Sequence, residues 1–84
     1  MSTDPHGAGK AETDRFAQRH RELAIQIAEV EQKVAATEEQ VAELHDHLAE
    51  ERGDRKYQEL ADDARAHAKV AREMAARARA VAAD

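Results

Sequence analysis

The chain has 84 residues, enough for one small domain, and a net charge of −5. Although 42% of the residues are hydrophobic, twenty of them are alanine and only one Phe and one Tyr are present. So few large side chains cannot fill a broad globular core, and the scarcity of turn residues and β-branched runs excludes a many-stranded sheet. The absence of cysteine excludes a disulfide framework and a cysteine metal site, and it makes the cytoplasm the default compartment.

The N-terminal segment differs in composition from the rest of the chain. Residues 1–11 include Pro5, Gly7 and Gly9 and predict a flexible tail. They lack a basic-then-apolar signal pattern, and no apolar run reaches the roughly 18 residues of a membrane span. Arginine outnumbers lysine nine to four and asparagine is absent, a composition associated with GC-rich bacterial genomes.

A strict periodicity begins after this segment. Apolar residues recur at alternating steps of three and four, as in a coiled-coil helix. The d positions of this heptad pattern are Phe16, Leu23, Val30, Thr37 and Leu44. The a positions are His20, Ile27, Val34, Val41 and Leu48. Alanine recurs at b, beside the a row, where it can widen the contact face; these residues are Ala28, Ala35, Ala42 and Ala49.

A second pattern of the same kind follows. Its a positions are Tyr57, Ala64, Ala71 and Ala78, and its d positions are Leu60, His67, Met74 and Val81. Every e position is alanine, at Ala61, Ala68, Ala75 and Ala82. Small residues at a and e let a partner helix approach closely. Residues 57–82 therefore resemble the alanine-rich antiparallel helix pair known as an Alacoil, a resemblance that concerns geometry and implies no activity.

The two patterns are out of phase. Leu48 and Tyr57 are both a residues, but one straight helix would place them about 180° apart. A break at Gly53-Asp54 lets the two apolar stripes face each other, because Gly suits the position after a helix and Asp suits an N-cap. The sequence thus predicts an all-α antiparallel hairpin with coiled-coil packing: a helix over 12–51, a turn over 52–54 and a helix over 55–83.

Charge supports the antiparallel pairing. Residues 25–44 carry a net charge of −4 and residues 64–83 a net charge of +4. A register in which paired residue numbers add up to about 108 places these segments together and matches a with d, as in Leu44 with Ala64. A register near 101 matches a with d as well. We expect Ile27, Val34, Val41, Leu44 and Leu48 to be more deeply buried than Ile25 and Val70, which lie off the seam. The residues of the helix-pairing seam are Leu23, Ile27, Val30, Val34, Val41, Leu44, Leu48, Tyr57, Leu60, Ala64, Ala71, Met74, Ala78 and Val81.

The unequal helix lengths motivate a prediction of self-association. In the preferred register the second helix ends near residue 25, so Phe16, His20 and Leu23 overhang without cover from their own chain. We expect two hairpins to pair into a four-helix bundle with two-fold symmetry, which would cover these residues. The alternative is a monomer whose overhang is the docking site for a different protein.

Few residue groups suggest chemistry. Glu43, His47 and Glu51 line one helix face, but such rows are usually solvated, and we predict neither a metal site nor a cofactor. His20 and His67 occupy core-type positions, where a polar residue often fixes register; a pH switch is the alternative. No Ser–His–Asp set or cofactor-binding loop can be assembled, so we expect no enzyme activity and no small-molecule substrate.

The function predicted from the sequence is protein–protein interaction, as a small coiled-coil scaffold, adaptor or assembly subunit. One alternative is a transcription regulator, because the acidic residues near the turn look loosely like the acidic hairpin tip of factors that enter RNA polymerase; these residues are Asp46, Glu50, Glu51 and Asp54. Another is nucleic-acid binding through a basic stripe on the second helix, formed by Arg65, Arg72 and Arg79.

Overall fold

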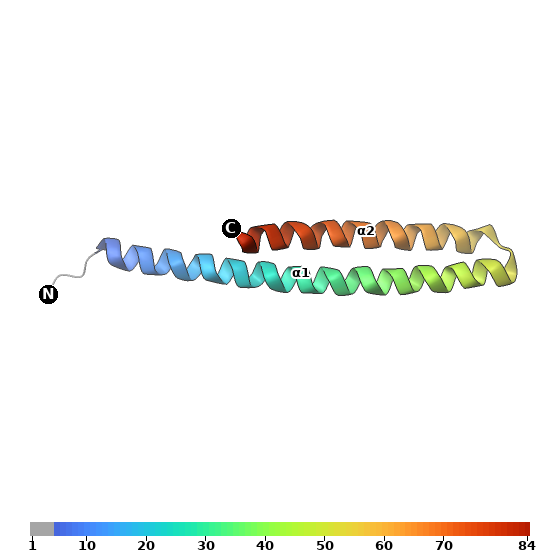
Figure 1. Cartoon of the computed structure of the whole chain (residues 1–84), viewed down its shortest axis with the longest axis horizontal. Coiled ribbons are helices and arrows are strands. Elements are labelled where there is room, and N and C mark those ends of the chain that lie inside the picture. Colours follow the sequence, from blue (N-terminus) through green and yellow to red (C-terminus); the bar gives the residue numbers. More distant parts are fainter. Residues whose placement is uncertain (1–4) are drawn as a thin grey trace.

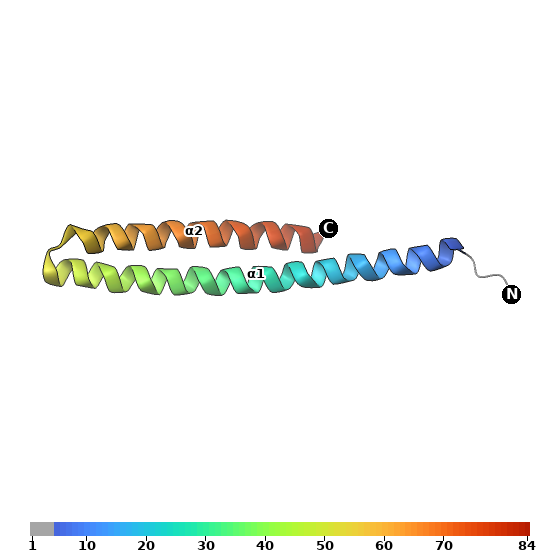
Figure 2. The ribbon, with the colours of Figure 1, turned by 180° about the vertical axis from the view of Figure 1, so that it is seen from behind.

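The chain folds into a long helical hairpin (Figure 1). The computed structural model describes the backbone of residues 5–84 and the side chains of residues 10–84. Within that range there are two helices, α1 (Pro5–Arg52) and α2 (Arg55–Ala83), and no strand. The helices lie antiparallel along their shared length, which is also clear from behind (Figure 2), and form a rod of 79 × 15 × 13 Å. The predicted all-α hairpin is confirmed.

The turn forms where the sequence predicts it. Gly53 adopts φ +64°, a left-handed conformation that glycine takes without a Cβ clash, and its N–H donates to the Ala49 carbonyl over 2.8 Å. Asp54 then caps α2, because its side chain accepts a hydrogen bond from the Lys56 N–H over 2.9 Å. Gly53 ends α1 and Asp54 caps the start of α2, so the chain reverses within two residues.

The start of α1 differs from the prediction. The helix begins at Pro5, inside the segment predicted as a tail, and runs on through Gly7 and Gly9. Proline is well suited to the first helical position, because its missing N–H would be unsatisfied there and its fixed φ is helical. The tail predicted for residues 5–11 is thus replaced by helix, while residues 1–4 lie outside the described part.

The buried core of the hairpin is made of alanine. Among the described side chains, the buried hydrophobic residues are Ala24, Ala28, Ala35, Ala42, Ala61, Ala64, Ala68, Ala71, Ala75 and Ala78. All of them except Ala24 form three clusters that repeat every seven residues: Ala28 with Ala75 and Ala78, Ala35 with Ala68 and Ala71, Ala42 with Ala61 and Ala64. In each cluster, one alanine of α1 fits between two alanines of α2.

This core corrects the predicted helix-pairing seam. The a residues of α2 are buried at Ala64, Ala71 and Ala78, but the larger seam residues remain substantially exposed; they are Leu23, Ile27, Val30, Val34, Leu44, Leu60, Met74 and Val81. Ile27 is 50% exposed and the off-seam Ile25 is 48% exposed, so the expected difference between them is wrong. Val41, Leu48 and Tyr57 are half-buried.

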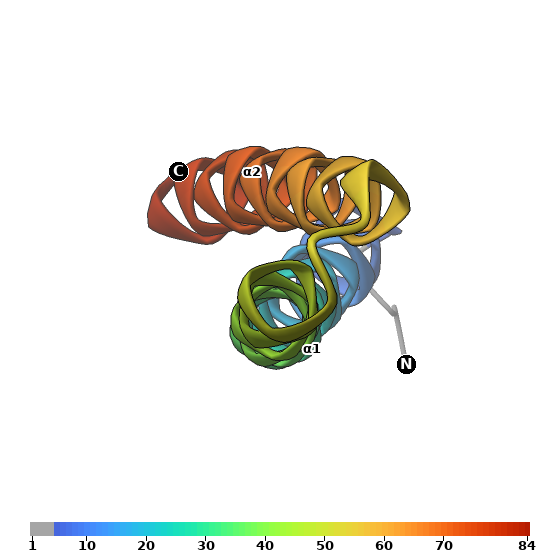
Figure 3. The ribbon, with the colours of Figure 1, turned by 90° about the vertical axis from the view of Figure 1, so that its right-hand side faces the viewer.

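The physical reason is side-chain size. Two alanine rows let the helix backbones approach closely, and a Leu or Val between them would hold the helices apart. The row at b of α1 therefore meets α2 in place of most of the a and d residues, although Val41 of the a row still packs against the cluster of Ala42, Ala61 and Ala64. The contacts are shifted accordingly, since Ala42 rather than Leu44 packs against Ala64. Viewed along the rod, the two helices are inclined to each other (Figure 3).

Candidate functional site

One side of the hairpin carries ion pairs between the helices. Arg65 donates to Asp46 and Arg72 donates to Glu39 through their guanidinium groups, seven residues apart on each helix. The hydrogen bond from Arg65 to Asp46 raises the pKa of the Arg65 guanidinium, and the charges of Asp46, Asp62 and Glu43 add to this effect. We call this side the charged face.

The opposite side is mainly apolar, although His67 of α2 lies 3.7 Å from Glu38 of α1 on it. On α1, Glu39 and Val34 lie on opposite sides of the strip of buried alanines. At 100° per residue, each points about 70° around the helix axis from the centre of that strip. On α2, Arg72 and the d row, which includes His67 and Met74, flank the strip of buried alanines in the same way. Since the ion pairs join Glu39 to Arg72, the bulky rows of both helices share the other side.

This apolar face is the main candidate for a functional surface. We define it by the exposed residues Leu23, Ile27, Val30, Val34, Leu44, Leu60, Met74 and Val81. Large exposed apolar patches are uncommon on monomeric proteins and mark interaction sites. Its residues were identified from the sequence, but as a seam inside the hairpin. The signal that separates the two roles is the seven-residue alanine repeat present in both helices.

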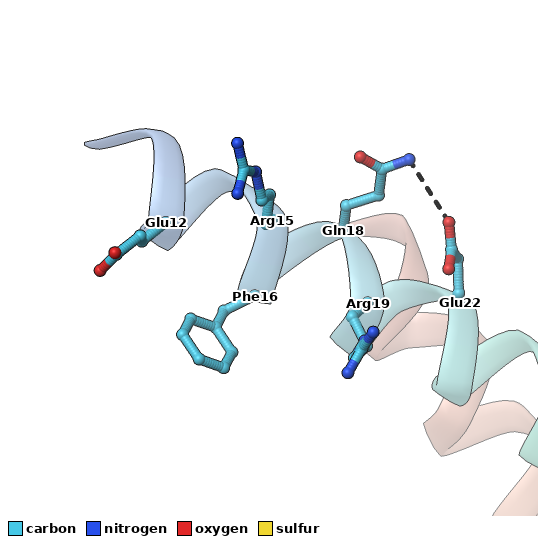
Figure 4. A pocket seen from close by; sticks show the side chains of 6 residues that line it. All are labelled: Glu12, Arg15, Phe16, Gln18, Arg19 and Glu22. Carbon is cyan, nitrogen blue, oxygen red and sulfur yellow. Dashed lines mark hydrogen bonds between the residues drawn. The ribbon is translucent and has the colours of Figure 1, made fainter. Parts of the chain in front are cut away.

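The apolar stripe of α1 continues past the end of α2. Ala28 packs with Ala75 and Ala78, so Ala83 at the end of α2 lies opposite about residue 21 of α1. The overhang therefore includes Phe16 and His20, as predicted, whereas Leu23 lies beside the last turn of α2. Phe16 is 73% exposed and borders an open hollow with Arg19. Figure 4 shows both side chains projecting from the same side of α1, away from the hydrogen bond that Gln18 donates to Glu22 over 3.3 Å.

The two ends of the α1 stripe differ in charge. Residues 15–21 hold Arg15, Arg19 and Arg21 and no acidic residue, a net charge of +3. Residues 43–51 hold four carboxylates and no Lys or Arg, a net charge of −4; they are Glu43, Asp46, Glu50 and Glu51. A positive end and a negative end thus flank one apolar stripe.

Aromatic stacking orders the tip of the hairpin. The rings of His45 and Tyr57 stack with their centroids 6.4 Å apart, and the Arg52 guanidinium lies 5.9 Å from the Tyr57 ring centroid. The Nδ1 atom of His45 is buried without a hydrogen-bond partner. These contacts lie between α1 and the first turn of α2 and fix the approach of the two helices.

The structure places both core-type histidines on the surface. His20 is exposed on the overhang, and His67 is 70% exposed beside Glu38, with 3.7 Å between Nδ1 and Oε2. Neither histidine is buried in the core of the hairpin, so neither fixes the register from there. A pH switch that depends on a histidine buried in the core therefore has no support. Among the described residues, no three His, Asp or Glu side chains are grouped closely enough to bind a metal ion.

The predicted basic stripe of α2 is partly neutralised. Arg65 and Arg72 pair with carboxylates of α1, whereas the next position of the repeat places Arg79 beside Gln32, with which it lines a shallow hollow. Arg79 therefore faces a neutral amide where the two preceding arginines face acids.

Comparisons of the chain with protein-family models, curated proteins and solved structures gave no match. Neither helix, over its described residues, combines the length and the apolar character needed to cross a bilayer.

Proposed function

We propose that the chain is a non-enzymatic protein-interaction module that binds a helical surface through its apolar face. The observation that carries this proposal is the exposure of the bulky heptad stripe of α1 together with the d row of α2 on one side of the rod. A scaffold, adaptor or assembly subunit needs such a rigid, extended surface.

The energetics of the two seams support this role. Burying a Leu, Ile or Val side chain contributes about 1.5–3 kcal/mol, and alanine contributes much less. The contact between the two helices of the chain is made by small residues, and we interpret it as Alacoil-type coiled-coil pairing. The larger residues, at the spacing that recognises a partner helix, remain available for binding.

The alternatives gain less support. Insertion of an acidic tip into RNA polymerase needs free carboxylates, but Asp46 is paired with Arg65, and Arg52 lies over Tyr57 at the same end. Nucleic-acid binding by α2 needs free arginines, and two of the three in its stripe are paired with α1.

A photo-crosslinking experiment in the cells that make the protein tests the proposal. A benzophenone amino acid replaces Val30 on the apolar face or, as a control, Ile25 on the charged face; both residues are about half exposed. Irradiation should give a protein adduct at position 30 and little at position 25. Equal or absent adducts at the two positions would contradict a binding role for the apolar face, whatever the partner.

A further inference from the structure

The stripe on α1 is longer and more complete than any surface that α2 offers. Apart from Thr37, it carries large residues at both a and d from Phe16 to Leu48, whereas α2 carries them only at d, because its a positions after Tyr57 are alanine. A helix that covers the whole stripe must match its length, its seven-residue period and its residues at both positions. Within this chain only α1 has these properties.

We propose that a second copy of this chain covers the apolar face, with α1 packed antiparallel against α1 of the second copy in a two-fold four-helix bundle. This inference rests on the proposed function and names the partner of the same surface. The two-fold axis crosses the rod, so the overhang of each copy lies beside the tip of the other.

The pairing register follows from the stripe itself. In an antiparallel coiled coil a residues face d residues. When the paired residue numbers add up to about 64, all ten stripe positions are matched in this way: Phe16 meets Leu48 of the second copy, and Val30 meets Val34. A shift by one heptad in either direction would leave large residues at one end of the stripe unpaired.

This arrangement also covers the overhang. Phe16 and His20 extend past α2 of their own chain, where Phe16 is 73% exposed. In the proposed register they meet the second copy between Leu44 and Leu48, close to its Leu60. A bundle with the two-fold axis along the rod would place both overhangs at the same end, beyond both α2 helices, and leave them without this cover.

Charge complementarity points the same way. The +3 segment at residues 15–21 lies beside Glu43, Glu50 and Glu51 of the second copy, at both ends of the bundle, while Asp46 stays paired with Arg65 of its own chain. An axis along the rod would instead bring the two negative tips together. Opposite charges across an interface favour association and fix orientation.

A sedimentation experiment tests the partner. The wild type should sediment at about twice the 9.3 kDa of one chain at micromolar concentration. Ile27→Ser should weaken the dimer at least about tenfold, because the residue is buried twice in a symmetric interface. Ile25→Ser, at equal exposure on the other face, should leave the dimer unchanged. Circular dichroism of both variants must show intact helix, which the alanine core maintains.

A crosslinking experiment tests the register. Because the chain has no cysteine of its own, a thiol-specific reagent reacts only at the introduced positions. Gln26 and Gln40 flank the stripe at g and should lie together across the interface. A short bis-maleimide reagent should join Gln26→Cys chains to Gln40→Cys chains when the two variants are mixed. Neither variant should crosslink alone, because the identical residues then lie about 20 Å apart.

The outcomes separate the two proposals. A dimer that crosslinks in the mixture alone supports the antiparallel pairing, and a dimer without this crosslink overturns it. A wild type that stays monomeric at high micromolar concentration overturns the second copy as partner. An adduct with a different protein at position 30 would then still support a binding role for the apolar face. The absence of any adduct would contradict both the binding role and the second copy as partner.

Discussion

At Gly53 the chain needs a backbone conformation that most residues adopt only at a cost. A Cβ at this position would meet nothing within 4 Å, so any penalty comes from φ +64° and not from crowding. Gly53→Val should lower the free energy of unfolding by about 1–2 kcal/mol, because a β-branched side chain strains the left-handed region. Urea denaturation measures the loss. Gly53→Asn is the control, because asparagine tolerates this conformation, and an equal loss in both variants would contradict the explanation.

The cap beside this glycine gives a second prediction at the residue scale. The Asp54 side chain satisfies the Lys56 N–H, which has no partner within the first turn of α2. Asp54→Ala should therefore destabilise the hairpin by about 0.5–2 kcal/mol, and Asp54→Ser should retain most of the stability because serine also caps helices. Thermal melts of the three proteins check this order; a serine variant as unstable as the alanine variant would contradict the capping role.

At the scale of the helices, side-chain size decides which rows meet. Ala35 is buried between Ala68 and Ala71, whereas the adjacent Ala36 is exposed on the same helix. Ala35→Leu should cost about 1–3 kcal/mol because the added atoms force the helices apart. Ala36→Leu should change stability little. Urea denaturation of the pair measures the difference, and equal effects would mean that the alanine rows do not form the interface.

The ion pairs between the helices form a ladder with one incomplete step. Asp46 pairs with Arg65 and Glu39 with Arg72, but the next position opposite Arg79 is Gln32. Gln32→Glu should stabilise the hairpin by about 0.2–1 kcal/mol, as exposed pairs do, and added salt should weaken the gain. The same substitution in an Arg79→Gln background is the control, and a gain that persists there would not come from this pair.

The sequence was sufficient for the helix ends near the turn but not for the seam. The end of one helix and the N-cap of the next have conformational and hydrogen-bonding requirements that Gly53 and Asp54 meet, so α2 was predicted with its observed bounds. The seam was ambiguous because the bulky row and the alanine row of α1 have the same seven-residue period. Size alone favours Leu44 and Val34 for burial, and the match between two alanine rows becomes decisive only when both helices are considered together. The start of α1 was missed because Gly7 and Gly9 weaken a helix without forbidding it.

For the molecule as a whole, an alanine core leaves the larger apolar residues outside, and their distribution sets the shape of the assembly. In the proposed register the two copies overlap along almost their full length. The α1 helix of the second copy, residues 5–52, lies beside positions 12–59 of the first copy. The dimer should therefore double the mass while its longest dimension stays near the 79 Å of one hairpin. Small-angle X-ray scattering measures both quantities in one sample. A dimer much longer than this would mean that the hairpins join end to end through their overhangs. Ile27→Ser, diluted until it is monomeric, supplies the reference, because it should keep the length of the rod and lose half of the mass.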